Sequence, residues 1–298
     1  MARIIGTASS QGRFSRFPAI GDNTLIATYY LGTAGLSFYG NILYSSSTAM
    51  QFGYYDNYPF LISWDGTGQI NFQKTYTIDS TKTYPNSAYK DSSSGYIYAS
   101  SYANTTNGRG YIYKIDSTGE IVWAKGDSGN NALGIIDVDS SGNMYVQRYI
   151  GESERISKVN SSGTAQWQKV ANNGLQIRGG GLNSSGTYLY THGYTRPSGG
   201  NRMWLRQYST SDGSITNKKY VSAGSLGSGS VIYDTSGNLY WGGGDSDGVG
   251  NNAFLLKTDG SLNLTWSKTI TSGNNMSARA TDSSGNVYCS LDLSLIHI

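Results

Sequence analysis

A short motif recurs along this chain, and it constrains the fold more than any other feature of the sequence. It joins a polar turn to the start of an apolar strand and reads Asp-Ser-Ser-Gly-Asn-Val-Tyr at 282–288, Asp-Thr-Ser-Gly-Asn-Leu-Tyr at 234–240 and Asp-Ser-Ser-Gly-Asn-Met-Tyr at 139–145. Looser copies surround Gly186, Gly95 and Gly40. Self-similarity at a fixed period indicates a protein built from repeated structural units.

A second turn motif alternates with the first. It reads Lys-Ile-Asp-Ser-Thr-Gly-Glu-Ile-Val-Trp-Ala-Lys at 114–125 and Lys-Val-Asn-Ser-Ser-Gly-Thr-Ala-Gln-Trp-Gln-Lys at 158–169, with weaker copies centred on Gly68, Gly213 and Gly260. The turn glycines of each motif recur every 44 to 55 residues, so both motifs share one period. That period accommodates four short strands and their connections, which is the blade unit of a β-propeller.

The strands of one copy can be placed from their alternation of apolar and polar residues, at 134–138, 143–149, 155–159 and 165–170. Turns of the Asp/Asn-Ser-Ser-Gly type join them, because glycine adopts positive φ and short polar side chains hydrogen-bond their own backbone. The composition agrees, with 40 Gly, 25 Tyr and only 4 Pro, and with 14% charged residues. We therefore expect an all-β propeller of four-stranded antiparallel blades, with about five and a half blades present.

The repeat positions themselves are expected to be structural. The tryptophans should pack between neighbouring blades, while a lysine that follows each fourth-strand ring points to solvent from an edge strand; cofactor stacking on these rings is the alternative. The structural positions are Gly95, Tyr98, Gly119, Trp123, Gly142, Tyr145, Gly163, Trp167, Gly237, Tyr240, Trp266, Gly285 and Tyr288.

At these motifs the chain resembles bacterial β-propeller repeats with an Asp-x-x-Gly-Asn-hydrophobic-Tyr core, and also quinoprotein-like propeller repeats. The resemblance spans residues 31–290 and implies architecture rather than activity, since propellers host many functions. A quinoprotein dehydrogenase would imply a pyrroloquinoline quinone, a metal and an acidic base, yet only the structural turn and the tryptophan match. No catalytic residue is carried over.

The repeats divide the chain into three parts. Residues 1–23 are expected to form an N-terminal arm or attachment segment, and residues 24–292 the propeller repeats. The sixth copy stops after its second strand, and the final Leu-Ser-Leu-Ile-His-Ile at 293–298 fits neither motif. It reads like the translation of a sequencing-library adapter, so we expect a non-native tail on a truncated propeller of six to eight blades.

Charge and reactive residues exclude several functions. The net charge of +3 is small and its lysines and arginines are scattered, which argues against nucleic-acid binding. Cys289 is the only cysteine, and no apolar run is long enough for a membrane span. With His297 set aside, His192 is the only histidine, and we expect it at a strand end or in a loop rather than acting as a general base. The compartment stays open, with an extracellular or virion location as the hypothesis.

Two acidic segments and two glycine runs have alternative interpretations. The sequence at 137–142 resembles the opening of a calcium loop, but the same pattern recurs as a turn in the other copies. Asp245 with Asp247 is a second, weak calcium candidate. Apart from calcium, no cofactor is expected. The glycine runs at 179–181 and 242–244 open no helix, so strand-end bulges or turns are favoured over phosphate loops.

The connections that differ between copies are the best candidates for function. If strands alternate in direction, both repeated turns lie at one end of each blade, which we call the uniform end. The other two connections lie at the opposite, varied end. Aromatic and basic residues among Gly, Ser and Asn there resemble adaptable binding surfaces, although solvated loops would look the same. The candidate binding residues are Tyr102, Arg109, Tyr149, Tyr194, Arg196 and Arg202.

Three functions remain open from the sequence. The first is a non-catalytic module that binds a glycan or protein partner through the varied ends, as an extracellular or phage-tail component. The second is a structural assembly protein without a ligand, and the third is a quinoprotein-like or lyase propeller enzyme. The oligomeric state is not predicted.

Overall fold

The computed structural model describes residues 15–16, 27–28, 36–43, 48–55, 58–65, 67, 69–78, 83–91, 93–103, 108–127, 132–150, 153–171, 176–195, 202–221, 231–245, 252–271, 275–282 and 284–292. The chain divides into two compact units, Met1–Ile135 and Ile136–Ile298, each of which is described by itself. The described residues form strands and turns and contain no helix. No apolar helix that could span a membrane is found among them.

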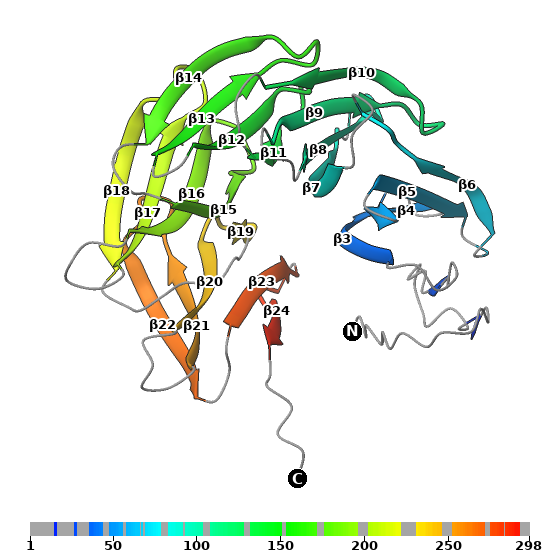
Figure 1. Cartoon of the computed structure of the whole chain (residues 1–298). Coiled ribbons are helices and arrows are strands. Elements are labelled where there is room, and N and C mark those ends of the chain that lie inside the picture. The colour runs from blue at the N-terminus through cyan, green and yellow to red at the C-terminus, as the bar shows by residue number, and fades with distance from the viewer. Residues whose placement is uncertain are drawn as a thin grey trace. The chain divides into compact units, whose positions relative to one another are not determined.

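The first unit contains two complete four-stranded antiparallel sheets and a short hairpin (Figure 1). One sheet has the order β3 (Leu36–Leu43), β4 (Thr48–Tyr55), β5 (Tyr58–Asp65) and β6 (Ile70–Thr75). The other has the order β7 (Thr83–Lys90), β8 (Ile97–Ala103), β9 (Gly110–Ile115) and β10 (Ile121–Gly126). The hairpin pairs β1 (Ser15–Arg16) with β2 (Ala27–Thr28).

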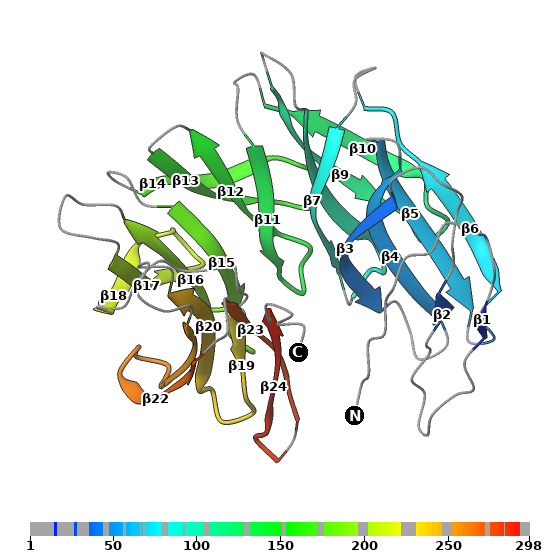
Figure 2. The same ribbon diagram turned by 60° about the horizontal axis from the view of Figure 1, so that its bottom comes forward.

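The next sheet begins with β11 (Ala132–Val138), which spans the boundary between the units, followed by β12 (Met144–Ile150), β13 (Ser153–Val159) and β14 (Ala165–Ala171). Two more complete sheets follow: β15 (Gln176–Leu182), β16 (Tyr188–Thr195), β17 (Arg202–Ser209) and β18 (Ile215–Val221), then β19 (Val231–Tyr233), β20 (Leu239–Asp245), β21 (Asn252–Thr258) and β22 (Leu264–Thr271). Finally β23 (Asn275–Thr281) pairs with β24 (Val287–Asp292), and β23 lies against β20 (Figure 2).

Strand order follows chain order in every sheet, so each four-stranded sheet is a meander of the kind expected for a propeller blade. For the copy whose strands were placed from the sequence, the predicted and observed bounds differ by two residues or fewer. The described part of the chain thus contains five blades and the two-stranded sheet β23–β24, which confirms the predicted fold class.

The repeated turns form because each begins with a side chain that binds the turn's own backbone. In the turn at 234–238, Asp234 Oδ1 accepts hydrogen bonds from the Ser236 and Asn238 amides, both at 2.9 Å. Gly237 has a φ of +78°, in the left-handed region where a Cβ is unfavourable. The turn glycines at 95, 119, 142, 163, 186, 213 and 285 share this conformation.

Two of the looser sequence copies differ from the expectation, one in its place and one in its left-handed residue. Gly40 lies inside β3, where the register shifts between Phe38 and Asn41, so the predicted turn is a bulge; the β3–β4 connection follows Leu43. In the copy centred on Gly260, the left-handed residue is Leu262, with a φ of +63°. Leucine at a left-handed turn position gives no sequence signal, because this conformation is costly for any residue with a Cβ.

One of the two glycine runs differs from the prediction. The run 179–181 does include a bulge, between Ile177 and Gly179 of β15. The run 242–244 instead lies within β20 in regular register with β21, so the prediction of a strand-end bulge or turn was wrong. A Cβ on Gly242 would meet Met276 O of β23 at 2.4 Å, which shows that close approach of β23 requires glycine here.

Each unit has its own apolar core between successive sheets. In the first unit the rings of Phe52 and Tyr113 lie 6.1 Å apart among buried aliphatic residues. In the second unit Trp241 packs with Tyr190, Met203 and Leu256. Alternate residues of the inner strands contact the preceding and the following sheet, as Trp204 and Met203 of β17 do, which is the arrangement of stacked blades.

Candidate binding surface

The varied end of the blade β7–β10 carries a pair of stacked tyrosines. Tyr84 of β7 and Tyr102 of β8 are paired across the strands, with ring centroids 5.5 Å apart and an interplanar angle of 28°. Tyr102 is 36% exposed and Tyr84 is half-buried. Two rings held against each other at a strand end form a preorganised flat surface, because each has few torsions left to order on binding.

The strand register continues this row across the whole blade. Tyr102 is paired with Gly110 of β9, and the Asp127 amide donates to Gly110 O at 2.9 Å just beyond β10. Tyr84, Tyr102, Gly110 and Asp127 thus occupy neighbouring positions on one face of the sheet. Within this row Gly110 is buried, whereas Tyr102 is exposed.

Tyr84 and Asp127 were missed by the sequence analysis, because both lie at the borders of strands rather than within a variable connection. The pairing of neighbouring strands is the information that could have identified them. Once Tyr102 is assigned to the end of the second strand, the first residues of the first strand and the last of the fourth must lie beside it. That inference needs the register, which a bulge between Pro85 and Ser87 shifts in this blade.

The other predicted binding residues are only partly placed. Arg109 is exposed, and its carbonyl accepts the Ala103 amide at 2.8 Å, so the register puts its side chain on the opposite face of the sheet from Tyr102. The backbones of Tyr149 and Tyr194 lie near the ends of β12 and β16, and Arg202 begins β17. Each is at the varied end of its blade. Arg196 lies outside the described residues.

The weak calcium candidates receive no further support. Asp245 ends β20, where it is paired with Asn252, and Asp247 lies outside the described residues. Among the residues that the structure describes, no group of three His, Cys, Asp or Glu side chains is arranged to hold a metal ion.

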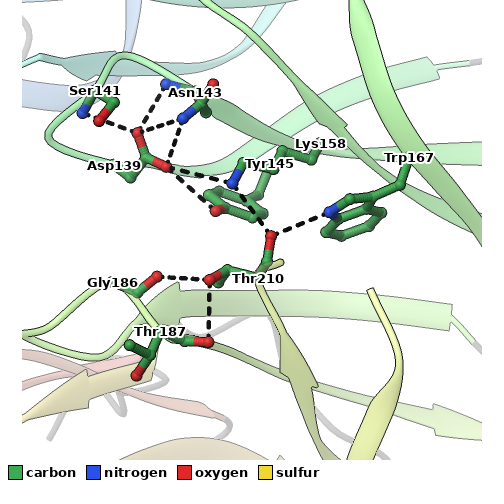
Figure 3. A network of polar contacts seen from close by, with 9 residues as sticks. All are labelled: Asp139, Ser141, Asn143, Tyr145, Lys158, Trp167, Gly186, Thr187 and Thr210. Atoms are coloured by element: carbon green, nitrogen blue, oxygen red, sulfur yellow. Dashed lines mark hydrogen bonds and ion pairs between the residues drawn. The ribbon is translucent and has the colours of Figure 1, made fainter. Parts of the chain in front are cut away.

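Asp139 is the first residue of a turn and accepts hydrogen bonds in a polar network within the second unit (Figure 3). Its carboxylate accepts hydrogen bonds from the Ser141 amide, the Asn143 amide and side chain, and the Tyr145 hydroxyl, and Lys158 Nζ lies 3.9 Å away. Lys158 Nζ and Trp167 Nε1 both donate to Thr210 O of the next blade, at 3.2 and 3.1 Å. The uniform end thus binds neighbouring blades together.

A buried carboxylate also lies near this end, on the innermost strand β11. Asp137 Oδ2 accepts the Leu182 amide of β15 at 2.8 Å, and Oδ1 accepts the Val138 amide. Burial raises the pKa of Asp137, with a smaller contribution from nearby Asp139, although the two backbone donors oppose the change. Its hydrogen bonds hold the end of the adjacent innermost strand.

The expected position of His192 was wrong. It lies in the interior of β16, fully buried, and its ring meets the Trp241 ring edge-on with centroids 5.9 Å apart. Residues 189–193 are buried without interruption, so this part of β16 is an inner strand covered on both faces.

The repeated rings of the fourth strands contact their own blade, and some also contact the next one. Trp123, Trp167 and Trp266 each lie beside the tyrosine of their own blade, with centroids 6.4, 6.1 and 6.1 Å apart. Phe72 and Trp167 also cover turn glycines of the following blade, Gly119 and Gly213. The lysines at 125, 169, 219 and 268 are exposed, whereas Lys74 is half-buried and pairs with Glu120.

No protein-family model matches the chain, and neither does any curated protein sequence. Solved structures do match. The Dos1 propeller has a TM-score of 0.59 at 13% identity, covering 90% of this chain and 66% of that one. Kuenenia stuttgartiensis hydrazine synthase also has a TM-score of 0.59, at 12% identity, over 84% of this chain and 72% of that one. Drosophila Plexin A, in complex with Semaphorin 1b, has a TM-score of 0.51 at 8% identity, over 76% and 52%.

At these identities the likeness concerns the fold alone. The fold is already described by five successive four-stranded antiparallel meanders in chain order. Together with the similarity to the Dos1 propeller, they establish that this chain is an all-β protein with the β-propeller fold.

Proposed function

We propose that this chain is a non-catalytic binding propeller, and that the varied ends of its blades hold a glycan or protein partner. The observation that carries the proposal is the partly exposed stack of Tyr84 and Tyr102 at such an end. Tyrosine offers a large apolar surface with a polar tip at a low entropic cost, which suits it to recognition. An extracellular or phage-tail setting is part of the proposal, as the place where such partners occur.

The polar side chains of the uniform end are used within the fold, and this supports a binding role for the varied end. The acidic side chains of the uniform end, such as Asp139 and Asp234, are engaged in their own turns. Asp137, the buried carboxylate with a raised pKa, is hydrogen-bonded to two backbone amides. Such groups stabilise the fold, and we assign no acid or base role to them. The quinoprotein-like resemblance stays a hypothesis based on the turn and the tryptophan.

One structural neighbour was solved with a protein partner, Drosophila Plexin A with Semaphorin 1b, and another is the enzyme hydrazine synthase. The fold is therefore compatible with binding and with catalysis, and the choice rests on the site. A structural assembly role without a ligand is the competing function for this chain.

The test compares two tyrosines of equal exposure at opposite ends of a blade. Tyr102 is 36% exposed at a varied end, and Tyr188, at the start of β16, is 37% exposed at a uniform end. The labelled chain is applied to a glycan array and to a displayed peptide library. We expect Tyr102→Ala to weaken the selected ligands at least tenfold, which corresponds to about 1.4 kcal/mol. Tyr188→Ala should bind as the wild type does.

Thermal unfolding of both variants controls for stability, since exposed positions typically change it by less than about 0.5 kcal/mol. If Tyr102→Ala binds every selected ligand as tightly as the wild type, the proposal is wrong. Concentration-dependent assembly in analytical ultracentrifugation, unchanged in Tyr102→Ala and without any selected ligand, would instead establish the structural role.

A further inference from the structure

The strand β24 has one open edge within the described part of the second unit. It pairs with β23 on one side (Figure 2), and no described strand pairs with its other side. The second strand of every four-stranded sheet is paired on both sides. An open edge presents backbone donors and acceptors to which a further strand can add, and the side chains beside it determine which strand fits.

A polar arrangement that includes a lysine in the complete blades is present here without one. The Tyr288 hydroxyl donates to Asp282 Oδ2 at 3.1 Å, and Asn286 Nδ2 donates to the same oxygen at 2.8 Å. The blades β11–β14 and β19–β22 repeat these contacts and add Lys158 or Lys257 of the third strand, as Figure 3 shows for Lys158. The lysine Nζ lies 3.9 and 3.8 Å from the turn carboxylate.

Strand register determines where that lysine would lie. The tyrosines equivalent to Tyr288 are each paired with a lysine of the third strand, whose Nζ lies 5.2–5.6 Å from the centre of the ring: Tyr98 with Lys114, Tyr145 with Lys158 and Tyr240 with Lys257. Tyr240 is 2% exposed, whereas Tyr288 is 47% exposed. A strand added in this register would place an ammonium over an exposed ring and beside the Asp282 carboxylate, which it complements in charge.

The neighbouring blade specifies the turn that would follow such a strand. Where β14 meets the next blade, Lys158 and Trp167 both donate to Thr210 O, and the Trp167 ring covers the left-handed Gly213 of the same turn. Trp266 is the equivalent ring of β22, and no described residue accepts a hydrogen bond from its Nε1. A turn with a glycine at this position would fit below the ring and present a carbonyl to the indole N–H.

From these contacts we infer that β24 and Trp266 together bind a β-hairpin of a partner polypeptide. A lysine in its first strand lies opposite Tyr288, and a glycine five residues later lies below the Trp266 ring. The second sequence motif has this spacing, with Lys114 before Gly119 and Lys158 before Gly163.

The occupant is assigned to a separate polypeptide for two reasons. Both hairpins of this chain that carry the lysine and the glycine are already paired within their own blades. Residues 1–73 contain no lysine, so the N-terminal segment cannot supply one. This surface does not include Tyr102, and the inference goes beyond the proposed function at the varied end.

The experiment uses the full chain and a fluorescein-labelled peptide of residues 110–126, which carries Lys114 and Gly119. Fluorescence anisotropy measures the dissociation constant, and hydrogen exchange with mass spectrometry locates the contact. We expect saturable binding and slower amide exchange in Val287–Asp292, because an added strand accepts hydrogen bonds from the open edge. A peptide with the same composition in scrambled order is the control.

Peptide variants test the specificity without altering the protein. Lys114→Ala should weaken binding about tenfold, because the contacts with the Tyr288 ring and the Asp282 carboxylate are lost. Gly119→Leu should abolish binding. In its own blade a Cβ on Gly119 would lie 2.5 Å from the Phe72 ring, and the Trp266 ring takes the place of Phe72 at the proposed site.

A compensating change in the protein tests the contact with Trp266 directly. At the contact between β18 and the next blade, Asn217 replaces the large ring and donates to Ser261 O in the turn that contains Leu262. Trp266→Asn should therefore bind the Gly119→Leu peptide more tightly than the wild-type protein does. The reverse order of affinities for the unchanged peptide completes the cycle.

Two matched tyrosine variants show whether the effect is local. Tyr288→Ala should weaken the hairpin about tenfold, whereas Tyr188→Ala and Tyr102→Ala should bind it as the wild type does. Melting temperatures identify any variant that fails to fold, and the peptide variants then decide. Because Tyr102→Ala should affect only ligands of the varied end, failure of one proposal is distinguishable from failure of the other.

The inference is wrong if the labelled hairpin does not bind, or if the Lys114→Ala and Gly119→Leu peptides bind as tightly as the unchanged one. Self-association of the full chain that protects the same β24 amides without any peptide would show that a second copy occupies the edge. That outcome would also overturn the assignment to a partner hairpin.

Discussion

Two successive contacts between blades of the second unit each bury a large side chain, but a strand supplies it at one contact and a turn at the other. At the first contact, the Trp167 ring of β14 lies over Gly213, in the β17–β18 turn of the next blade. At the second, the position equivalent to Trp167 is Asn217 of β18, and the position equivalent to Gly213 is Leu262, in the β21–β22 turn. The large side chain has moved from the strand to the turn.

The distances show that the two arrangements are mutually exclusive. A Cβ on Gly213 would lie 2.7 Å from Trp167 Cε3, closer than side chains tolerate. Leu262 is 2% exposed and packs with Tyr190, Met203 and Trp241, although its φ of +63° is unfavourable for leucine. The first unit repeats the ring-over-glycine arrangement with Phe72 and Gly119.

The polar partners of the turn carbonyl change together with the packing. Thr210 O accepts from Lys158 and Trp167, whereas the equivalent Gly260 O accepts from the Tyr190 hydroxyl and Gln207 Nε2, both at 2.9 Å. Gln207 is paired with Asn217 as Lys158 is paired with Trp167. A turn carbonyl buried between blades needs donors, and either set supplies them. At these two contacts, the buried side chain and the hydrogen-bond donors of the carbonyl differ together.

The largest effect on stability is expected when a second large side chain is added at the first contact. Gly213→Leu would force a side chain into the Trp167 ring at a left-handed position, and overpacking plus backbone strain should destabilise the protein by about 4 kcal/mol. The double variant Trp167→Asn with Gly213→Leu reproduces the second contact. Urea unfolding should show it to be more stable than the sum of the two single changes by about 2 kcal/mol. Simple additivity would show that the two positions are not coupled.

A smaller effect is expected at the second contact. Leu262→Gly relieves the strained backbone but removes a buried leucine side chain, so the free energy of unfolding should fall by about 2–3 kcal/mol. Gly260→Ala is the matched control in the same turn, because its Cβ would meet neighbours no closer than 3.7 Å. Urea midpoints of the two variants measure the difference. An unchanged midpoint for Leu262→Gly would mean that its strain cancels its packing.

The smallest effect concerns charge. Burial alone would raise the pKa of Asp234, but hydrogen bonds from Asn238, Tyr240 and Ser236 outweigh it and lower that pKa below its usual value of 3.8. A lowered pKa in the folded state stabilises the protein above that value, and the stabilisation is lost as the pH falls below about 4. The blade β15–β18 has the neutral Asn183 at the equivalent position.

Asp234→Asn should therefore cost about 1 kcal/mol at pH 7 and flatten the loss of stability between about pH 4 and pH 2. Asn183→Asp should do the reverse by adding a titrating carboxylate to a neutral turn. Urea midpoints measured at both ends of that range test the exchange. Parallel pH profiles for the wild type and Asp234→Asn would show that this carboxylate does not couple to folding.

Much of the fold follows from local sequence. The Asp-x-x-Gly-Asn turns form because donors and acceptors lie within four residues of each other, as Asp139 and Asn143 show, and the alternation that follows sets each strand. Gly40 was misplaced for the same reason, since a local match without its tertiary partner can equally be a bulge. The candidate surface was found at Tyr102 and not at Tyr84 or Asp127, because their proximity depends on strand register.

By itself, the sequence determined the period of the repeat, the four-stranded unit and the turn chemistry, since these depend on the conformational preferences of a few adjacent residues. Only the tertiary structure decided that Leu262 takes the left-handed position, that Gly242 must lack a side chain and that Tyr102 stacks on Tyr84. Each depends on a strand or blade that is distant in the chain. Close packing between such segments determines which side chain fits at each position, and the local sequence pattern does not specify the segment that packs there.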